Sequence, residues 1–446
     1  MKRALLVVLA ALLAACGEER DLPDLAIDCR TGVYLSDADE AWVLTPTSSG
    51  YRWRMLNGAT GALGLDGGPS TLGWTEEQDG YVAELGDCGD TEIRFGPADA
   101  MERFQRVPLQ ITDTTFEHDG LTFSGHLVWP AEVERAPLVV HVHGSERWSA
   151  VRSDSMQYML AAQGIASFVF DKRGTGQSEG RYTQDFHVLA GDARAALNEA
   201  RRLAGDAAEI VGILGGSQGG WIGPLAASEA DVDFVVALYG MAEGPLAEDR
   251  AEVIQSVARA GWGEAEQAKA GELADAAGVI MASGFREGFD EFDRLRRAYR
   301  NEPWYDDVEG EFTGDFLPHP SIGLRVVGPF RDVGTSWDYD PIPVLRGLDV
   351  RQLWMIAADD SEAPSAETAR RLRSLQAEGR PIDLAVYPRA DHGMIAIERG
   401  ANGVVRETGY VQDYYRQVAG WIRDGDLTVA RASGAEVTTA VLDRTD

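Results

Sequence analysis

The stretch IVGILGGSQGGWIGPLAAS, residues 210–228, joins a short apolar run to a run typical of a helix through a glycine-rich turn. An apolar run of this kind predicts a strand that is buried on both faces. The pattern G-x-S-x-G around Ser217 is a weak signal alone, but a strand before it and a helix after it make it a strong one. Ser217 is therefore a candidate nucleophile. The alternative is a tight turn with a bystander serine.

The glycines of this turn have a physical purpose. The turn must lift the Ser217 hydroxyl clear of the sheet, and side chains at Gly215 and Gly219 would collide with the neighbouring strand and helix. The start of the following helix directs the backbone N–H of Gln218 towards a negative charge that develops on a substrate oxygen.

The region around this turn alternates between strands and helices. Short apolar runs predict further buried strands at residues 138–142, 165–170, 234–238, 353–357 and 384–387. Residues 188–203 are amphipathic, and residues 410–423 predict a closing helix. Two runs, 109–117 and 121–129, flank His118-Asp119-Gly120 and predict a β-hairpin. This order predicts an α/β fold in which a mostly parallel sheet carries helices on both faces.

Two loops after predicted strands accompany the turn at Ser217: HVHGS at residues 141–145 and DKRGTGQS at residues 171–178. Together these motifs resemble the α/β-hydrolase superfamily, most closely bacterial carboxylesterases related to the serine aminopeptidases. The likeness covers about residues 107–243 and 342–425. It implies that the backbone N–H of Ser145 is a second oxyanion donor beside Gln218. It also implies a structural role for the loop 171–178.

The resemblance implies a base and an acid for the serine, in the chain order Ser, acid, His. Of the seven histidines, His392 follows the predicted last strand, at the sheet edge where catalytic residues gather. In similar enzymes the acid stands three residues after a small residue and four before a proline. This frame selects Asp360, with Asp359 as the reserve, and disfavours Glu362. Ala357 departs from the pattern, because similar enzymes usually have glycine there.

Taken together, the motifs predict a serine hydrolase that cleaves small carboxylic esters through an acyl-enzyme on Ser217 (EC 3.1.1 rather than 3.4). A peptidase or amidase with the same triad is the alternative, since the fold cannot choose between ester and peptide bonds. An acidic cluster that could bind a peptide amine contains Asp306, Asp307, Glu309 and Glu311. A solvated acidic face is the other interpretation of this cluster. The third hypothesis is a non-catalytic, surface-anchored binding protein.

The sequence predicts neither a metal site nor a cofactor. His141 and His143 share one face of a strand, but no acidic or thiol ligand stands nearby at metal-site spacing. The chain has no phosphate loop, dinucleotide fingerprint or cysteine metal site. Its formal net charge of −31 indicates a surface that repels nucleic acid, and we expect no nucleic-acid partner.

The pattern of residues indicates several structural units. Residues 244–340 are too long for a connection and predict an inserted cap domain, with helices at residues 247–260, 264–281 and 289–299. Short runs rich in aromatic and branched residues before residue 105 predict β structure. The predicted division is a signal at 1–16, a small β-rich domain at 17–105, a hydrolase core at 106–243 and 341–433, the cap at 244–340 and a flexible tail at 434–446.

The first sixteen residues, MKRALLVVLAALLAAC, have a basic start and an apolar stretch too short to span a bilayer. The sequence LAAC resembles a bacterial lipobox, which implies that Cys16 is lipidated and becomes the mature N-terminus. The alternatives are an ordinary cleaved signal and a short buried helix. We therefore expect a protein of the cell envelope that contacts the membrane through its lipid only, with the outer membrane as the favoured destination.

The remaining two cysteines, Cys29 and Cys88, lie in the predicted β-rich domain. An exported protein meets an oxidising compartment, so we expect a disulfide between them rather than two buried thiols. Such a bridge closes a long loop and contributes about 4 kcal/mol in the chain-entropy model.

Overall fold

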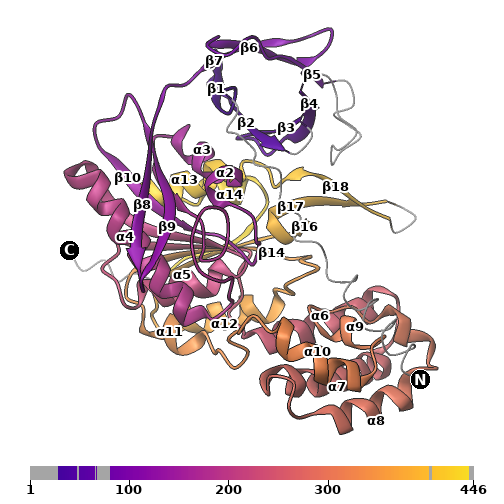
Figure 1. Cartoon of the computed structure of the whole chain (residues 1–446). Coiled ribbons are helices and arrows are strands. Elements are labelled where there is room, and N and C mark those ends of the chain that lie inside the picture. Colours follow the sequence, from indigo (N-terminus) through magenta and orange to yellow (C-terminus); the bar gives the residue numbers. More distant parts are fainter. Residues whose placement is uncertain (1–28, 48–49, 66, 68–80, 401–403, 441–446) are drawn as a thin grey trace, which may run out of the picture.

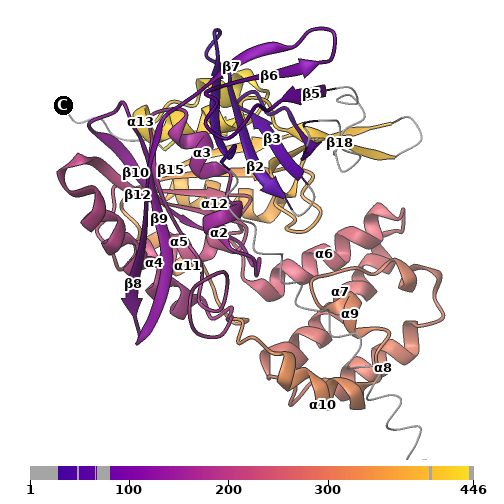
Figure 2. The same ribbon diagram turned by 45° about the horizontal axis from the view of Figure 1, so that its top comes forward.

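The computed structural model describes residues 29–47, 50–65, 67, 81–400 and 404–440. The predicted signal sequence and Cys16 lie outside these residues, so the lipid anchor stays a prediction. Figure 1 shows three units: a β-rich unit at the top, a central sheet covered by helices, and a helical cap at the lower right. Figure 2 shows from a second side that the β-rich unit and the cap adjoin the central unit at different places.

The central unit is built on a nine-stranded sheet with the order β19-β15-β14-β13-β12-β10-β11-β9-β8. The strands from β11 to β15 in this order are parallel, whereas β8, β9 and β19 pair antiparallel. The α/β fold predicted from the alternating runs is confirmed. The strands are β8 (Leu109–His118), β9 (Leu121–Pro130), β10 (Ala136–Val142), β11 (Ala166–Phe170), β12 (Ala208–Gly216), β13 (Phe234–Leu238), β14 (Arg351–Ala357), β15 (Ile382–Tyr387) and β19 (Glu436–Thr438).

Helices cover both faces of this sheet, and alternate strand residues point into two separate cores. On β12, Ile213 packs in the core under α4 and α5, whereas Leu214 packs in the core under α3 and α13. The helices of the first face are α4 (Phe186–Ala204), α5 (Gly219–Ala227), α11 (Ile342–Gly347) and α12 (Ala366–Ala377). Those of the second face are α3 (Met156–Ala161), α13 (Tyr414–Asp424) and α14 (Thr428–Ala432). Before α3 lies the short helix α2 (Ala150–Ser153).

Two predictions about the C-terminal part were wrong. Residues 410–413 are not helical, because Tyr410 ends β18 (Val405–Tyr410), which pairs with β17 (Ile395–Arg399) in a small sheet with β16 (Ala390–Asp391). The tail predicted from residue 434 is not loose in its described part. Strand β19 pairs with β15, and the backbone N–H of Ala440 donates to Asp383.

The β-rich unit is a seven-stranded sheet that curls into a barrel-like shape (Figure 1). Its interior is aromatic: Trp42, Trp53 and Phe95 pack together there. The structure has a Cys29–Cys88 disulfide with the Cα atoms 5.6 Å apart, as the sequence predicted. The strands are β1 (Gly32–Ser36), β2 (Ala41–Thr47), β3 (Gly50–Met55), β4 (Thr60–Gly64), β5 (Tyr81–Glu84), β6 (Glu92–Pro97) and β7 (Glu102–Arg106).

The barrel-like unit is docked firmly on the central unit. Ala41 and Val43 alternate with the barrel's own interior residues and pack into the core under α3 and α13. The turn between β3 and β4 meets the end of β18, where the Tyr410 N–H donates to the Gly58 carbonyl at 2.8 Å. A side chain at Gly58 would overlap the Tyr410 carbonyl, so this close approach requires glycine.

The cap follows β13 and has a hydrophobic core of its own, in which Trp304, Phe312 and Phe316 are buried. Its first three helices agree with the predicted ones within two residues. Its helices are α6 (Pro245–Arg259), α7 (Glu264–Ala282), α8 (Phe289–Tyr299), α9 (Thr313–Phe316) and α10 (Ser321–Arg331), with a 3-10 turn at η3 (Pro303–Asp307).

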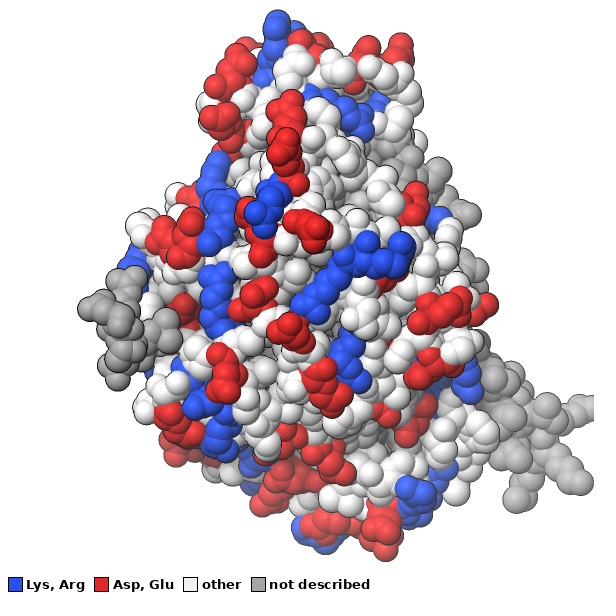
Figure 3. Space-filling model, turned by 90° about the vertical axis from the view of Figure 1, so that its left-hand side faces the viewer, with Lys and Arg blue, Asp and Glu red and all other residues white. Residues whose placement is uncertain are grey.

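One face of the molecule carries charged side chains of both signs. On the face seen in Figure 3, which is the left-hand side of Figure 1, basic side chains are interspersed with acidic ones. Among the described residues, none of the helices has the length and apolar character needed to cross a bilayer.

Candidate active site

Ser217 lies between β12 and α5 in a left-handed backbone conformation, with φ of +52°. This conformation is rare for a residue with a side chain and costs free energy. The surroundings hold it in place: the Ser217 N–H donates to the Leu238 carbonyl at 3.0 Å, and the Ser217 carbonyl accepts from Gly220 N–H at 2.7 Å. The strained turn predicted at Ser217 is thus present.

The glycines around Ser217 allow the turn to pack tightly. A Cβ at Gly215 would lie 2.0 Å from the Gly219 carbonyl oxygen, and one at Gly219 would lie 2.1 Å from the carbonyl oxygen of Val142. These distances are far below van der Waals contact, so no side chain fits at either position. The second contact also brings the start of α5 against the end of β10, where the loop with Ser145 begins.

Two side chains bind consecutive carbonyl groups of that loop. The buried Lys172 ammonium donates to the Gly144 carbonyl, and the Tyr182 hydroxyl donates to the Ser145 carbonyl at 2.6 Å. No peptide bond in the described structure is cis. In a trans peptide the C=O and N–H point in opposite directions. Lys172 therefore fixes the Gly144–Ser145 peptide with the Ser145 N–H directed away from the ammonium.

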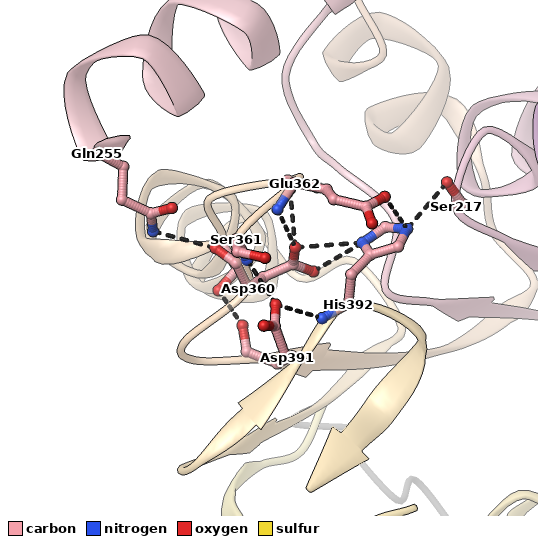
Figure 4. Close-up of polar contacts among 10 residues, drawn as sticks. Ser217, Gln255, Asp360, Ser361, Glu362, Asp391 and His392 are labelled. Carbon is pink, nitrogen blue, oxygen red and sulfur yellow. Dashed lines mark hydrogen bonds and ion pairs between the residues drawn. The ribbon is translucent and has the colours of Figure 1, made fainter. Parts of the chain in front are cut away.

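The structure brings Ser217, Asp360 and His392 together (Figure 4). His392 Nε2 lies 3.2 Å from Ser217 Oγ. The other ring nitrogen, His392 Nδ1, lies 3.0 Å from Asp360 Oδ2 and 3.2 Å from Oδ1. Each distance permits a hydrogen bond, so a hydroxyl, an imidazole and a carboxylate form one connected chain. The three residues come from the ends of β12, β14 and β16.

The two other carboxylates of the Asp360 loop have different surroundings. Asp360 is buried, and its Oδ1 accepts the backbone N–H groups of Glu362 and Ala363. Asp359 points elsewhere and pairs with Arg399 at 2.9 Å. Glu362 is exposed, and its carboxylate lies 3.6 Å from His392 Nε2, on the serine side of the ring (Figure 4).

Asp391, the residue before His392, joins the histidine loop to the acid loop. Its Oδ1 accepts the backbone N–H of His392 at 2.8 Å and that of Ser361 at 2.7 Å. The cap adds a further hydrogen bond to the acid loop: Gln255 Nε2 on α6 donates to the Asp360 carbonyl at 3.0 Å (Figure 4). These bonds hold the imidazole and the carboxylate at a fixed separation.

The charges around His392 favour its protonated form. Burial lowers the pKa of His392, but the hydrogen bond and charge of Asp360, together with Glu362 and Glu248, raise it to about 9. The Tyr239 ring packs edge-on against the imidazole, with centroids 5.1 Å apart. Tyr239 also has a positive φ, +42°, so strained backbone occurs at the ends of both β12 and β13.

A group of carboxylates from the cap faces the same region. Burial and neighbouring acids raise the pKa of Glu252 to about 8, and they raise the pKa values of Glu248 and Glu311 as well. Of the acidic cluster predicted in the insertion, Glu311 is close enough to His392 for their charges to interact. Asp307 instead accepts from the Trp262 indole, and Glu309 pairs with Arg259.

His141 and His143, which were considered for a metal site, contact carboxylates and a hydroxyl instead. His141 Nδ1 lies 2.7 Å from Asp154, and its Nε2 lies 3.1 Å from Ser167 Oγ. His143 Nδ1 lies 3.5 Å from Glu146. Among the described residues, no three His, Cys, Asp or Glu side chains are grouped so that they could hold a metal ion.

The sequence analysis missed several residues of the site. It gave the loop 171–178 a structural role, which fits Arg173 in its bidentate pair with Asp192, but it overlooked the contact of Lys172 with Gly144. The chain has only three lysines, and this scarcity was the one available signal. Tyr182 and Tyr239 carry no motif, and their positions follow from tertiary structure alone.

One protein-family model matches part of the central unit. Residues 134–261, which include Ser217, match the family model described as serine aminopeptidase, S33. The sheet and helices of the central unit have the α/β-hydrolase fold. No curated protein sequence matches the chain at a significant level.

Three of the solved structures that resemble this chain are two esterases and a peptidase. An esterase from Pyrococcus furiosus is 15% identical, with 64% of this chain and 84% of that chain covered and a TM-score of 0.41. An esterase from Pyrobaculum calidifontis is 16% identical, with 65% and 77% covered and a TM-score of 0.41. An acylaminoacyl peptidase from Pyrococcus horikoshii is 14% identical, with 78% and 51% covered and a TM-score of 0.39.

We expect Glu362→Gln to lower the pKa of His392, because it removes a negative charge 3.6 Å from Nε2 while the bond to Asp360 remains. The measurement is an NMR titration of the histidine ring protons, with His392 assigned by its loss in His392→Gln. The wild-type resonance should titrate near pH 9. Glu378→Gln, at an exposed site paired with Arg346, is the control and should leave the titration unchanged. An unchanged pKa in Glu362→Gln would contradict the assigned cause.

Proposed function

We propose that this α/β hydrolase is a serine hydrolase that cleaves carboxylic esters through an acyl-enzyme on Ser217. The observation that carries the proposal is the connected chain from the Ser217 hydroxyl through His392 to the buried Asp360. A hydroxyl is a weak nucleophile unless a base accepts its proton, and the base must be oriented by a third group. Small acyl esters are the proposed substrates.

In the proposed mechanism, Ser217 Oγ attacks the ester carbonyl carbon while His392 Nε2 takes the hydroxyl proton. The N–H groups of Gln218 and Ser145 stabilise the negative charge on the carbonyl oxygen. His392 then gives the proton to the departing alkoxide, which leaves as the alcohol, and the acyl group stays on Ser217. Water, deprotonated by the same His392, releases the acid and restores the serine.

The pKa of His392 sets the pH dependence of this mechanism. Only neutral imidazole accepts the serine proton, and a pKa raised to about 9 keeps the ring protonated at lower pH. The value of kcat/KM therefore rises with pH through the neutral range towards pH 9.

A second candidate is an aminopeptidase that uses the same triad. The carboxylates of Glu248, Glu252 and Glu311 on the cap side favour it, since they provide negative charge for a substrate ammonium group. The ester hydrolase remains the first proposal, because the triad and the oxyanion donors suffice for it and no separate amine site is required.

We expect Ser217→Ala and His392→Ala each to reduce turnover by a factor of about 10⁴–10⁶, because the nucleophile and its base act as one unit. The measurement is the hydrolysis of 4-nitrophenyl acetate and butyrate beside aminoacyl 4-nitroanilides. The unfolding temperatures should stay near the wild-type value. Full activity in either variant would reject the triad, and cleavage of the anilides without the esters would favour the aminopeptidase.

Lys172 is proposed as a positioning residue for the Ser145 N–H. Its ammonium binds the Gly144 carbonyl and so sets the direction of the next N–H along the chain. Burial lowers the pKa of Lys172 to about 8, against the opposing charge of Glu146. An uncharged side chain of similar length would leave the Gly144 carbonyl without its donor, and the peptide could turn.

We expect Lys172→Met to lower kcat by up to about 10²–10³-fold, as the loss of one oxyanion donor does, with little change in KM. Affinity for an alkyl boronic acid that mimics the tetrahedral state should fall by a similar factor. Lys269→Met, on α7 of the cap, is the matched control and should behave like the wild type. A change in KM alone would show that Lys172 acts on substrate binding instead.

The predicted location follows from the signal sequence and not from the described residues. We propose that lipid on Cys16 anchors the enzyme in the cell envelope. A Cys16→Ser chain that stays in the membrane fraction would contradict this.

A further inference from the structure

A cavity of about 370 Å³ lies beside the site, between the barrel-like unit and the central unit. It is lined by Arg54 of β3, by His143, Gly144 and Glu146 of the loop after β10, and by Gly216 and Tyr239 at the ends of β12 and β13. Gly144 directly precedes Ser145, and Gly216 directly precedes Ser217. Consecutive Cα atoms are about 3.8 Å apart, so the cavity reaches the residues next to Ser217 and Ser145 in the chain.

Arg54 brings a positive charge to this cavity from the barrel-like unit. Its Nε donates to the Tyr410 hydroxyl at 3.3 Å, and its Nη1 donates to Thr45 Oγ1 at 3.0 Å. Within the described structure, no residue accepts a hydrogen bond from Nη2, and no carboxylate lies within ion-pair distance of Arg54. A guanidinium presents a planar set of donors that matches a carboxylate.

Two acidic residues, Asp154 and Glu146, also line the cavity. Asp154 uses one oxygen for His141 Nδ1 and the other for the Met156 N–H, both at 2.7 Å. Burial raises the pKa of Glu146, but His143 and the charge of Lys172 hold it below its ordinary value. Glu146 Oε2 lies 3.5 Å from His143 Nδ1 and accepts no hydrogen bond within the described part of the chain. Arg54 is the one arginine or lysine among the described residues that line this cavity, and no carboxylate contacts it.

The positive charge of Arg54 lowers the pKa of a neighbouring tyrosine. Burial raises the pKa of Tyr410, yet the charges of Arg54 and Arg52 hold it below its ordinary value. At the other wall, His143 Nε2 is buried and has no hydrogen-bond partner among the described residues. A polar ligand in the cavity would thus meet a free guanidinium edge and a free imidazole nitrogen.

We propose that this cavity binds a carboxylate of the substrate through Arg54, so that the preferred esters carry an acidic group remote from the scissile bond. The inference rests on the proposed function for its catalytic meaning, although the binding site itself does not depend on turnover. The barrel-like unit then takes part in substrate recognition, because Arg54 is its contribution to the cavity. The close packing of Gly58 against Tyr410 holds β3 at this distance from the core.

The test compares esters that differ only in charge. One pair carries the acid on the acyl part: 4-nitrophenyl hydrogen adipate and its methyl ester. The other pair carries it on the leaving group: 4-carboxyphenyl butyrate and its methyl ester. We expect wild type to prefer the acid in one pair. Arg54→Gln should lower kcat/KM for that acid by about ten- to a hundredfold, as the loss of a charge-assisted hydrogen bond does, with the methyl ester within about twofold.

Arg52→Gln is the matched control, since Arg52 lies on the same strand and the same face but does not line the cavity. It should keep the preference for the acid. Equal loss on acid and methyl ester in Arg54→Gln would assign Arg54 a structural role and overturn the inference. So would the lack of a preference in both pairs.

A binding measurement separates this inference from the proposed function. Monomethyl adipate is titrated by calorimetry into Ser217→Ala, with and without Arg54→Gln. Binding that is lost only with Arg54→Gln supports the anion site even if no ester is hydrolysed. Binding that is the same in both variants, or absent from both, overturns the anion site. Ester hydrolysis that Ser217→Ala leaves intact would instead refute the proposed function.

Discussion

The site depends on the left-handed backbone at Ser217. A residue with a side chain occupies this conformation only where its surroundings enforce it. Here Gly215 and Gly219 let strand, turn and helix approach to distances that no Cβ permits. The same close packing places the start of α5 against the end of β10. Ser217 and the loop that contains Ser145 are therefore positioned by one constraint, and His392 and Asp360 come close to Ser217 from other strands.

Much of this arrangement could be predicted, because its signals are local in sequence. The turn at Ser217 follows from glycine spacing between a strand and a helix, and the hairpin of β8 and β9 follows from Asp119-Gly120. The chain order and the proline frame that pointed to Asp360 and His392 came from the resemblance to α/β hydrolases. The short strands β16 and β19 were not predicted. They have only two and three residues, and β19 pairs with a strand that is distant in the chain. The position of Arg54 was not predicted either, because only the docking of the barrel-like unit brings it to the cavity that Gly216 also lines.

The three units give the site two electrically different sides. The cap contributes Glu248 and Glu252, whose pKa values are raised by burial and by neighbouring acids, Glu311 among them. The barrel-like unit contributes Arg54, whose positive charge no described carboxylate contacts. The acids around His392, Glu248 among them, favour its protonated form. In the proposed account, the two units that adjoin the core adapt it to its substrate.

The central claim is that Ser217 is a nucleophile activated by His392, and the most direct measurement of it is covalent labelling. Native protein is treated with a fluorophosphonate, digested, and analysed by mass spectrometry. The account requires one phosphonyl group per chain, on the peptide that contains Ser217, and strong loss of labelling in His392→Ala. An unlabelled Ser217 in folded protein, or labelling that does not depend on His392, would contradict it.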